Sequence, residues 1–406
     1  MTARVLDIEL TDGLSDHTDI GDYSQAFVLL RYHGSPVGSV RMPYTEGVLR
    51  AADLRDAIEA DDALSRRLAQ AVLSHWLLRT EPPPASLPTW SIVICTRNRT
   101  DDLRRCLNSL MRLRTPGGEI IVVDNAPMDD RTAQLVSGYP VRYVREDRPG
   151  LNWARSYGAR MAKGEIVMFT DDDVVVDPRW VEAILDPFDN PRVAAVTGLT
   201  MPLELETQAQ ELFEIYGGLA RGFQRRVFDY TVMAPCAAGI VGAGANMAFR
   251  RDLLNPMRLF DAELDAGTVT RTGGDAYAFY QLLAEGYKIV YNPAALVWHR
   301  HRRDYASLRN TLAAYNVGGF ALLTRCWIQH GDWQALAVAA SWFRHDHLRQ
   351  LARALLRRPN RLPLDLVLAQ ILAIPLGPWA YFVSRRRERA VSPKSAPEAE
   401  SMGAQS

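Results

Sequence analysis

The chain has 406 residues, 48% of them hydrophobic, which is enough to bury one large core and a smaller one besides. Its 47 basic residues balance 47 acidic residues, and this net charge of zero argues against a chain-wide attraction to nucleic acid. The four cysteines show no zinc-ligand spacing and are typical of reduced cytosolic thiols. Residues 1–22 are acidic and lack the apolar run of a signal peptide, so we expect a cytoplasmic protein.

Residues 1–80 are expected to form a small α+β module. The stretches 26–32 and 37–42 predict a β-hairpin, and two helices are expected at 51–60 and 62–78. His75 and Trp76 are interpreted as packing residues. No catalytic grouping appears here, so the module is assigned to oligomerisation, acceptor docking or partner binding. The proline-rich stretch 81–89 predicts a stiff linker that marks a domain boundary.

Residues 90–304 alternate between apolar strands and amphipathic helices, which indicates an α/β domain. Strands are expected at 91–95, 119–123, 141–144, 164–169, 193–198 and 288–291. Helices are expected near 103–110, 151–162 and 204–217. Ligands of open α/β sheets bind at the carboxyl ends of the strands, so polar residues after these strands are the candidates for a site.

The strand at 164–169 is followed by three consecutive acids, Asp171, Asp172 and Asp173. Neighbouring carboxylates repel one another, and Mg²⁺ or Mn²⁺ bridging to a diphosphate relieves that repulsion. Because strand side chains alternate, Asp171 and Asp173 point one way and Asp172 the other. Taken alone, such a triplet is equally typical of a strand end or a helix cap without function.

Further polar groups follow along the chain. The glycine-rich run 237–251 contains Gly242 and Gly244 but lacks the rest of a dinucleotide fingerprint, so its glycines indicate either close approach to a ligand or turn geometry. Arg155 is expected to make a structural salt bridge or a phosphate contact. Asp275, at the start of a predicted helix, is either an N-cap or a general base.

In their order, the segments 91–99, 119–125 and 169–174 resemble the nucleotide-sugar half of family 2 glycosyltransferases, which have the GT-A fold. The resemblance covers about residues 90–304. It implies a mixed, mostly parallel sheet flanked by helices, with Mn²⁺ or Mg²⁺ held by Asp171 and Asp173. The residues that it places at the donor are Thr96, Arg97, Asn98, Arg99, Asp124, Arg155, Asp171 and Asp172.

The same resemblance extends to the second half of the domain. It implies that the run containing Gly244 and Asn246 borders the acceptor pocket together with Gly274, and that Asp275 is the general base. Three residues depart from the family pattern: Ser156 replaces an Asn, Gly274 replaces a Glu, and Tyr277 replaces a frequent second Asp.

A basic run after the last predicted strand completes the expected site. The resemblance implies that His299 is the third metal ligand, with His301 as its competitor on the same face. Arg300 and Arg302 are expected to contact the diphosphate of the donor.

The implied reaction is an inverting transfer of a hexosyl group from a nucleoside-diphosphate donor to an acceptor hydroxyl, with a divalent metal and no organic cofactor. The sequence does not distinguish among uridine, guanosine and deoxythymidine donors, or among lipid-linked, glycan, peptide and small-molecule acceptors. The competing interpretation is a sugar-nucleotide or glycan-binding protein of the same fold without catalysis. A nucleotidyltransferase is a weaker alternative, since Thr96–Arg99 lacks the glycines of a triphosphate loop.

Residues 305–389 are expected to be helical. A helix is expected at 308–327, interrupted by Gly318 and Gly319, and a basic amphipathic helix is expected at 333–356. The apolar run 362–383 lies between arginine clusters and leaves three interpretations open: contact with an anionic membrane, a packing or dimer surface, or a true span. In the first, Trp379 and Tyr381 lie at headgroup depth, and the protein works at the inner face of the cell membrane. Residues 390–406 are expected to form a disordered tail.

Overall fold

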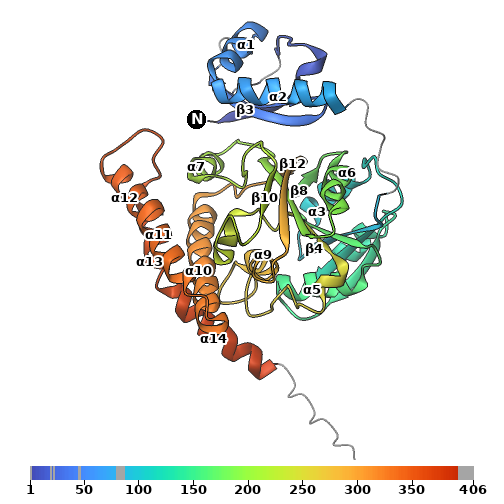
Figure 1. The fold of residues 1–406 in the computed structure, drawn as a ribbon, viewed down its shortest axis with the longest axis vertical. Helices are drawn as coiled ribbons and strands as arrows, with labels where there is room; N and C mark the ends of the chain where they lie inside the picture. The colour runs from blue at the N-terminus through green and yellow to red at the C-terminus, as the bar shows by residue number, and fades with distance from the viewer. Residues whose placement is uncertain (1, 19–20, 22, 44–46, 79–86, 392–406) are drawn as a thin grey trace, which may run out of the picture.

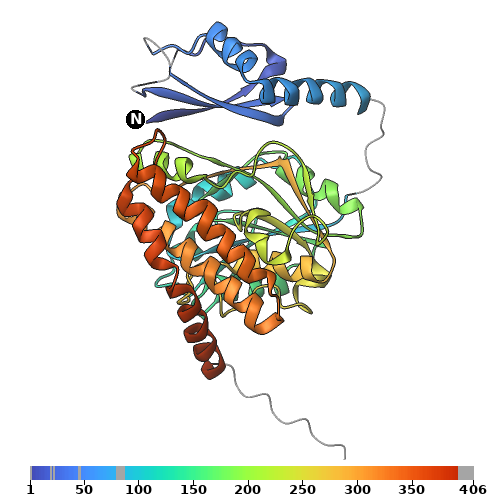
Figure 2. The same ribbon diagram turned by 60° about the vertical axis from the view of Figure 1, so that its left-hand side comes forward.

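The computed structural model describes residues 2–18, 21, 23–43, 47–78 and 87–391 (Figure 1). Most of the expected linker at 81–89, and the expected tail beyond Val391, lie outside these residues. The N-terminal module, the central α/β domain and a C-terminal set of helices follow one another along the chain, and the module lies over one end of the α/β domain (Figures 1 and 2).

The N-terminal module is a three-stranded sheet covered by two helices. Its elements are β1 (Ala3–Glu9), the short 3-10 helix η1 (Leu10–Asp12), β2 (Gln25–Tyr32), β3 (Ser35–Pro43), α1 (Ala51–Ala60) and α2 (Asp62–Leu78). The expected hairpin is β2–β3, and both helices occur where they were predicted. Strand β1, which pairs parallel to β2, was missed because its apolar residues are interspersed with charged ones. Trp76 was expected to pack, but its surface is 70% exposed.

One buried ion pair, Arg31–Asp177, and hydrogen bonds to backbone carbonyls hold the module to the α/β domain. Arg31 on β2 bridges Asp7 and Asp177, with N–O distances of 2.6 Å to each. The Arg179 guanidinium donates to the His33 carbonyl, and the Ala3 amide donates to the Leu205 carbonyl. The module is therefore docked on the domain by its strands.

The α/β domain is built on one mixed sheet. Its strands are β4 (Trp90–Thr96), β5 (Glu119–Asn125), β6 (Arg142–Glu146), β7 (Ile166–Asp171), β8 (Val174–Val176), β9 (Val193–Pro202), β10 (Arg226–Phe228), β11 (Asn246–Arg250) and β12 (Lys288–His299). They are ordered β10-β12-β9-β11-β7-β4-β5-β6, with β8 paired to β12. β4, β5, β6, β7, β9 and β12 run in one direction, while β8, β10 and β11 oppose them. The expected mixed, mostly parallel sheet is confirmed. The three strands that were not predicted from the sequence, β8, β10 and β11, are the ones that run antiparallel to the others.

Helices cover both faces of this sheet. They are α3 (Thr100–Leu110), α4 (Arg131–Val136), α5 (Leu151–Met161), α6 (Trp180–Leu185), α7 (Gln208–Tyr216), α8 (Arg251–Leu254) and α9 (Gly274–Ala284), with 3-10 turns η2 (Asp186–Asp189) and η3 (Pro235–Ile240). Side chains of β4 alternate between two cores: Ile92 and Ile94 pack with Leu103 of α3, whereas Val93 packs with Ala154 of α5. This alternation fixes the register of the strand that leads to the site.

The C-terminal region consists of helices packed along one side of the domain. They are α10 (Tyr305–His330), α11 (Gln334–Trp342), α12 (Leu348–Leu355), α13 (Leu364–Ala373) and α14 (Leu376–Val391). A π-helical turn, η4 (Phe343–His347), separates α11 from α12, so the single helix expected at 333–356 is divided. We call residues 334–387 the C-terminal arm. It runs beside α10, as both ribbon views show (Figures 1 and 2).

Helix α10 is continuous through Gly318 and Gly319, so the expected interruption was wrong. Both glycines permit close approach of a neighbouring segment. A β-carbon at position 318 would lie 2.0 Å from Thr272 Oγ1 and 2.4 Å from the Thr272 carbonyl oxygen, and one at position 319 would lie 2.5 Å from the Trp342 ring. The loop before α9 and the helix α11 thus rest directly on the backbone of α10.

We expect Gly318→Ala to destabilise the fold by about 1–3 kcal/mol, because the added methyl group overlaps backbone atoms that cannot rotate away. This outweighs the gain of about 1 kcal/mol that alanine normally gives inside a helix. Urea unfolding measures the difference. Gly239→Ala is the matched control, because a β-carbon there meets no heavy atom within 4 Å. Equal midpoints for the two variants would contradict this account of the α10 contact.

Candidate active site

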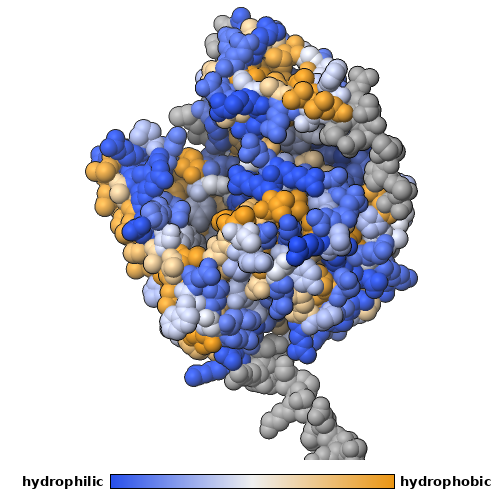
Figure 3. Space-filling view, in the orientation of Figure 1, coloured by the Kyte–Doolittle hydropathy of each residue, from blue (hydrophilic) through white to orange (hydrophobic). Residues whose placement is uncertain are grey.

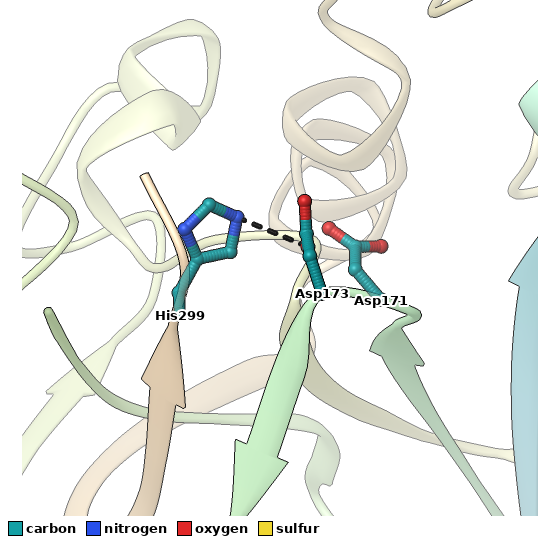
Figure 4. Close-up of side chains that lie close together, drawn as sticks. All are labelled: Asp171, Asp173 and His299. Carbon is teal, nitrogen blue, oxygen red and sulfur yellow. Dashed lines mark ion pairs between the residues drawn. The ribbon is translucent and has the colours of Figure 1, made fainter. Parts of the chain in front are cut away.

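Three ligand-type side chains meet where β7 and β12 end and β8 begins. Asp171 is the last residue of β7, Asp173 directly precedes β8, and His299 ends β12. β8 pairs antiparallel with β12, with Val174 opposite His299, and this pairing brings the histidine to the acids (Figure 4). One ligand atom from each residue lies within 4.8 Å of the other two. The structure thus joins the residues that the sequence proposed as metal ligands.

The chemistry of this cluster fits a divalent cation. Asp173 Oδ1 is buried without a hydrogen bond among the described residues and lies 3.3 Å from His299 Nε2. Burial raises the pKa of Asp171 to about 6. Burial also disfavours the charged form of Asp173, but His299 and Arg99 outweigh it and lower the pKa of that carboxyl. An unpartnered carboxylate oxygen beside a second carboxylate and an imidazole is a donor set suited to Mn²⁺ or Mg²⁺.

A hydrogen-bonded chain runs from His299 to His301 and on to Glu214 of α7. The two Nδ1 atoms are 3.0 Å apart, so one of them carries the shared hydrogen. His301 Nε2 is 2.8 Å from Glu214 Oε1, and the carboxylate can only accept. If the His301 ring donates only from Nε2, to Glu214, its Nδ1 accepts and His299 donates from Nδ1. Burial lowers the pKa of His299 to about 4, so its ring is neutral and its Nε2 lone pair faces the acids. His301, the competitor in the sequence, is the positioning residue behind His299.

The loop after β4 is bound to the other acid of the triplet. The Thr96 hydroxyl donates to Asp172 Oδ2 at 2.7 Å, and Arg99 Nη1 donates to Asp172 Oδ1 at 2.6 Å. Arg99 also donates to Asp173 Oδ2 at 2.9 Å. Asp172 thus points away from the cluster, as the strand alternation predicted, and burial raises its pKa to about 7. Arg97 is exposed at the rim of the cleft, and Asn98 accepts from the Met128 amide.

At the end of β5, the residue on the cleft wall is Asn125 rather than Asp124. Asp124 has 0% exposed surface, and its Oδ2 accepts from the Tyr143 hydroxyl at 3.0 Å. Burial raises the pKa of Asp124. Asp124 is therefore buried, and Asn125 is the residue of β5 that lines the cleft. The contact of Asp124 with a nucleotide stays a prediction.

Arg155 of α5 lies buried among acids beside the metal-type cluster. Its Nη1 donates to Asp265 Oδ2 at 2.6 Å, and its Nη2 lies 3.7 Å from Asp171 Oδ1. The structural salt bridge that the sequence left open is thus formed. The guanidinium also neutralises part of the acidic crevice.

Sequence analysis missed Asp265. It lies on the cleft wall in the loop before α9, with φ of 89°, and burial raises the pKa of its carboxyl. A β-carbon at position 274 would lie 2.5 Å from Asp265 Oδ2 and 2.3 Å from Asn152 Nδ2. Gly274 therefore leaves room for the Asp265 carboxylate, which supplies the acid beside Arg155. No periodicity or motif in this loop marks Asp265 in the sequence.

Asp275 is oriented by backbone donors. It lies in the first turn of α9, whose N-cap is Gly273, so the capping interpretation was wrong. Its Oδ2 accepts from the Gly244 amide at 2.8 Å and its Oδ1 from the Ala276 amide at 2.8 Å. A β-carbon at position 244 would lie 2.7 Å from Arg155 Nη2, so Gly244 allows the close approach of the glycine-rich run to this network.

Asn246 does not occupy an acceptor position. Its side chain is fully buried, its Nδ2 donates to the carbonyls of Leu199 and Ala295, and its Oδ1 accepts from Trp180 Nε1. Both polar atoms of the Asn246 side chain are thus used in hydrogen bonds to β9, β12 and α6. The motif residue is structural because it ties β11 to the bulge in β12 between Asn292 and Leu296.

The two arginines after β12 differ. Arg300 is paired with Asp102 and Glu204, with N–O distances of 3.2 Å to each. Arg302 has 51% of its side chain exposed, and its Nη1 lies 3.9 Å from Asp173 Oδ2. Arg302 is therefore better placed than Arg300 to receive an anionic ligand group.

A cleft of about 470 Å³ at the carboxyl edge of the sheet is lined by Thr96, Arg97, Arg99, Asn125, Asp171, Asp172, Asp173, Asp265, His299, His301 and Arg302. Arg155 and Asp275 lie beside this cleft through their contacts with Asp265 and Gly244 and are not among its lining residues. Its walls come from the ends of β4, β5, β7 and β12, from residues 265–272, and from α10 through Leu308, Thr311, Ala314 and Tyr315. The Cys95 thiol lies on the wall, but burial raises its pKa to about 12, so it is not a nucleophile.

Comparison with known proteins agrees with this architecture. Residues 91–256 match the family described as Glycosyl transferase family 2. These residues form a family 2 glycosyltransferase domain. The fold class inferred from the sequence, a GT-A fold with a mixed sheet and a C-terminal helical region, is confirmed.

Named relatives of the glycosyltransferase domain include a pre-mycofactocin glycosyltransferase of Mycobacterium tuberculosis, which is 28% identical over 311 residues. That match covers 74% of this chain and 60% of the mycobacterial protein, so the chain spans less than two thirds of this relative. A glucosyl-dolichyl phosphate glucuronosyltransferase of Haloferax volcanii is 25% identical over 231 residues, covering 52% of this chain and 68% of the relative.

Among solved structures, a mannosyltransferase from Pyrobaculum calidifontis in complex with GDP-Man and Mn²⁺ is similar with a TM-score of 0.45 and 20% identity. The similarity covers 80% of this chain and 95% of that one. GalNAc-T7 with UDP, GalNAc and Mn²⁺ is similar with a TM-score of 0.42 and 21% identity, covering 58% of this chain and 48% of that one.

Proposed function

We propose that this protein transfers a sugar from a nucleoside-diphosphate donor to an acceptor hydroxyl, with inversion at the anomeric carbon. The observation that carries this proposal is the cluster of Asp171, Asp173 and His299 at a cleft on the carboxyl edge of a family 2 glycosyltransferase domain. In this cluster, Asp173 Oδ1 is buried and has no hydrogen bond among the residues that the structure describes. Asp171, Asp173 and His299 would hold Mn²⁺ or Mg²⁺. A cation there supplies positive charge that stabilises the departing diphosphate.

The chain's own residues supply the other roles. Arg302 is placed to pair with a phosphate of the donor, and Arg155 offsets the charge of Asp171 and Asp265. Asp275, held by the Gly244 and Ala276 amides, accepts the proton of the acceptor hydroxyl. As the bond from the anomeric carbon to the acceptor oxygen forms, the bond to the phosphate oxygen breaks, and its electron pair leaves with the nucleoside diphosphate.

Two of the three departures from the family pattern, Gly274 and Tyr277, have structural explanations that favour an enzyme over a binding protein. The space beside Gly274 holds the Asp265 carboxylate. Tyr277 is buried under α10, where its hydroxyl lies 3.0 Å from His330 Nε2 and its ring lies 4.0 Å from the Arg325 guanidinium. Tyr277 therefore belongs to the core of the domain, and its presence does not remove a group from the cleft.

Donor turnover tests the proposal. Purified protein is incubated with UDP-, GDP- and dTDP-sugars and Mn²⁺ or Mg²⁺, and released nucleoside diphosphate and the anomeric configuration of the product or free sugar are followed by NMR. We expect metal-dependent release with inverted configuration for one class of donor. Retained configuration would overturn the single displacement. Folded protein that binds a donor but never cleaves it, with or without candidate acceptors, would favour the binding-protein alternative.

Glu214 should affect the metal affinity of the site without binding the metal itself. It accepts a hydrogen bond from His301 and thereby fixes the tautomer of His301 and, through it, that of His299. We expect Glu214→Leu to weaken Mn²⁺ binding by roughly 10–100-fold, the usual effect of losing such a partner. Electron paramagnetic resonance measures free Mn²⁺, and ¹⁵N NMR of the imidazoles reports the tautomer. Glu206→Leu, which removes an exposed acid paired with Arg303, is the control. Unchanged affinity together with an unchanged tautomer in Glu214→Leu would refute the relay.

A further inference from the structure

The exposed side of the C-terminal arm carries a long apolar stripe. Leu364, Leu368, Leu372 and Leu376 follow one another at intervals of four, and Trp379 and Phe382 continue at intervals of three. All six have between 41% and 70% of their surface exposed. These intervals keep the side chains on one face of α13 and α14. Both helices therefore expose an apolar face, and these six side chains together form the stripe.

The opposite face of the same helices is buried. Leu366 and Val367 pack with Leu308 and Leu312 of α10, and Ala373 and Ala380 pack with Val317. Tyr381, which the sequence placed at headgroup depth, has 0% exposed surface, so that expectation was wrong and only Trp379 of the pair faces outward. The inner face of these helices packs on the core of the domain, and among the described residues the stripe itself has no packing partner that buries it.

Positive charge surrounds the stripe. The arm carries nine arginines and only two acids, Asp346 and Asp365. Arg357, Arg358 and Arg361 lie at one end of the stripe and Arg385, Arg386 and Arg387 at the other. Among the described residues, the contacts of these arginines are with backbone carbonyls and Tyr381 rather than with carboxylates. Figure 3 shows apolar surface along the edge of the arm, bordered by hydrophilic residues.

We propose that this face of the arm docks the protein on the surface of an anionic phospholipid membrane. The six apolar side chains enter the interface, and the arginines at both ends pair with lipid phosphates. This goes beyond sugar transfer and does not depend on it.

Charge distinguishes this occupant from a second copy of the chain. Two arms packed face to face would oppose arginines to arginines whether the helices ran parallel or antiparallel, because both ends of the stripe are basic. An anionic surface complements both ends at once.

Packing distinguishes docking from crossing. Among the described residues, no single helix is long and apolar enough to span a membrane, and the pair Leu364–Ala373 and Leu376–Arg387 meets the length and composition criteria only together, with a bend of 47°. One face of this pair is held against α10 along its length. Only the other face is available to lipid, which is the arrangement of helices that lie in an interface.

Co-sedimentation of the full chain with vesicles tests the proposal. We expect binding to vesicles of phosphatidylcholine mixed with phosphatidylglycerol, weak binding to phosphatidylcholine alone, and release at high salt. Leu372→Asp combined with Trp379→Asp should weaken binding by roughly 100-fold, and Arg386→Gln combined with Arg387→Gln by on the order of tenfold, the latter for anionic vesicles only.

The control is a second exposed apolar pair, Leu73→Asp with Trp76→Asp on α2. Leu73 and Trp76 have 57% and 70% of their surface exposed, against 70% and 58% for Leu372 and Trp379. This control should bind vesicles as the unaltered protein does, and thermal unfolding checks that every variant is folded. The proposal is overturned if Leu372→Asp with Trp379→Asp binds vesicles as the α2 control does, or if the unaltered protein does not bind anionic vesicles. It is also overturned if the bound protein resists extraction at high salt and alkaline pH as a spanning protein would. Light scattering in which Leu372→Asp with Trp379→Asp turns a dimer into a monomer, without any vesicle binding by the parent, would assign the stripe to a second copy.

Discussion

Asp173→Asn should abolish metal-dependent sugar transfer, with turnover lower by at least roughly 1000-fold. A cation in the site contributes several kcal/mol of transition-state stabilisation, and each loss of about 1.4 kcal/mol is a factor of ten in rate. Asp173 Oδ1 is the buried oxygen without a partner in the cluster, so an amide there removes the charge at the point where it is needed. Steady-state kinetics with saturating donor, and Mn²⁺ affinity by electron paramagnetic resonance, measure the two losses.

Asp172→Asn is the matched control for this prediction. The substitution is the same and the residues are adjacent, but the Asp172 carboxylate faces Thr96 and Arg99 rather than His299. It should keep Mn²⁺ affinity within a few-fold while loosening the loop after β4. If both variants lost the metal equally, the assignment of Asp173 as a ligand and Asp172 as a loop anchor would be wrong.

Asp275→Asn should lower the transfer rate by roughly 100–10,000-fold and leave donor affinity intact. This range is the usual contribution of a positioned general base. Asparagine can still accept from the Gly244 amide through its oxygen, so the glycine-rich run should stay in place. Transfer kinetics and titration of the donor nucleotide in separate experiments distinguish loss of the base from loss of the site.

Asp265→Asn provides the contrast. Asp265 is the buried partner of Arg155, and removing one charge of a buried pair typically costs about 3–5 kcal/mol of stability. Urea unfolding should therefore show a clear loss for Asp265→Asn and little for Asp275→Asn. The roles would be reversed if Asp265→Asn were stable and inactive while Asp275→Asn retained transfer.

The parts of the fold that sequence reasoning predicted are those whose signal is local. β4, β5 and β7 are uninterrupted apolar runs with polar ends, and α1 and α2 carry a helical stripe of apolar residues. β8, β10 and β11 escaped because they are short or embedded in a glycine-rich run, and their strand character comes from their partners in the sheet.

The same distinction applies to the site. Asp171 and Asp173 were found because the acidic triplet comes just after the recognisable strand at 164–169, and His299 because the resemblance to family 2 glycosyltransferases marks its position. Asp265 lies in an irregular loop, and its function as the partner of Arg155 depends on a contact between residues 110 positions apart. Glu214 reaches His301 across 87 positions. For Asn246 the error is the reverse: the sequence assigned it to the acceptor pocket, but its side chain makes all of its hydrogen bonds within the core. Side-chain direction in such regions is set by tertiary packing, which a single sequence does not display.

The most direct test of the account is isothermal titration of UDP, GDP and dTDP into the full chain with Mn²⁺ and, separately, with a chelator. The account predicts that one of these nucleotides binds with Mn²⁺ and binds at least roughly tenfold more weakly without it, because the diphosphate and the Asp171–Asp173–His299 cluster share the cation. A folded protein that binds none of them, or binds one equally well in chelator, would contradict a metal-bridged diphosphate at this site.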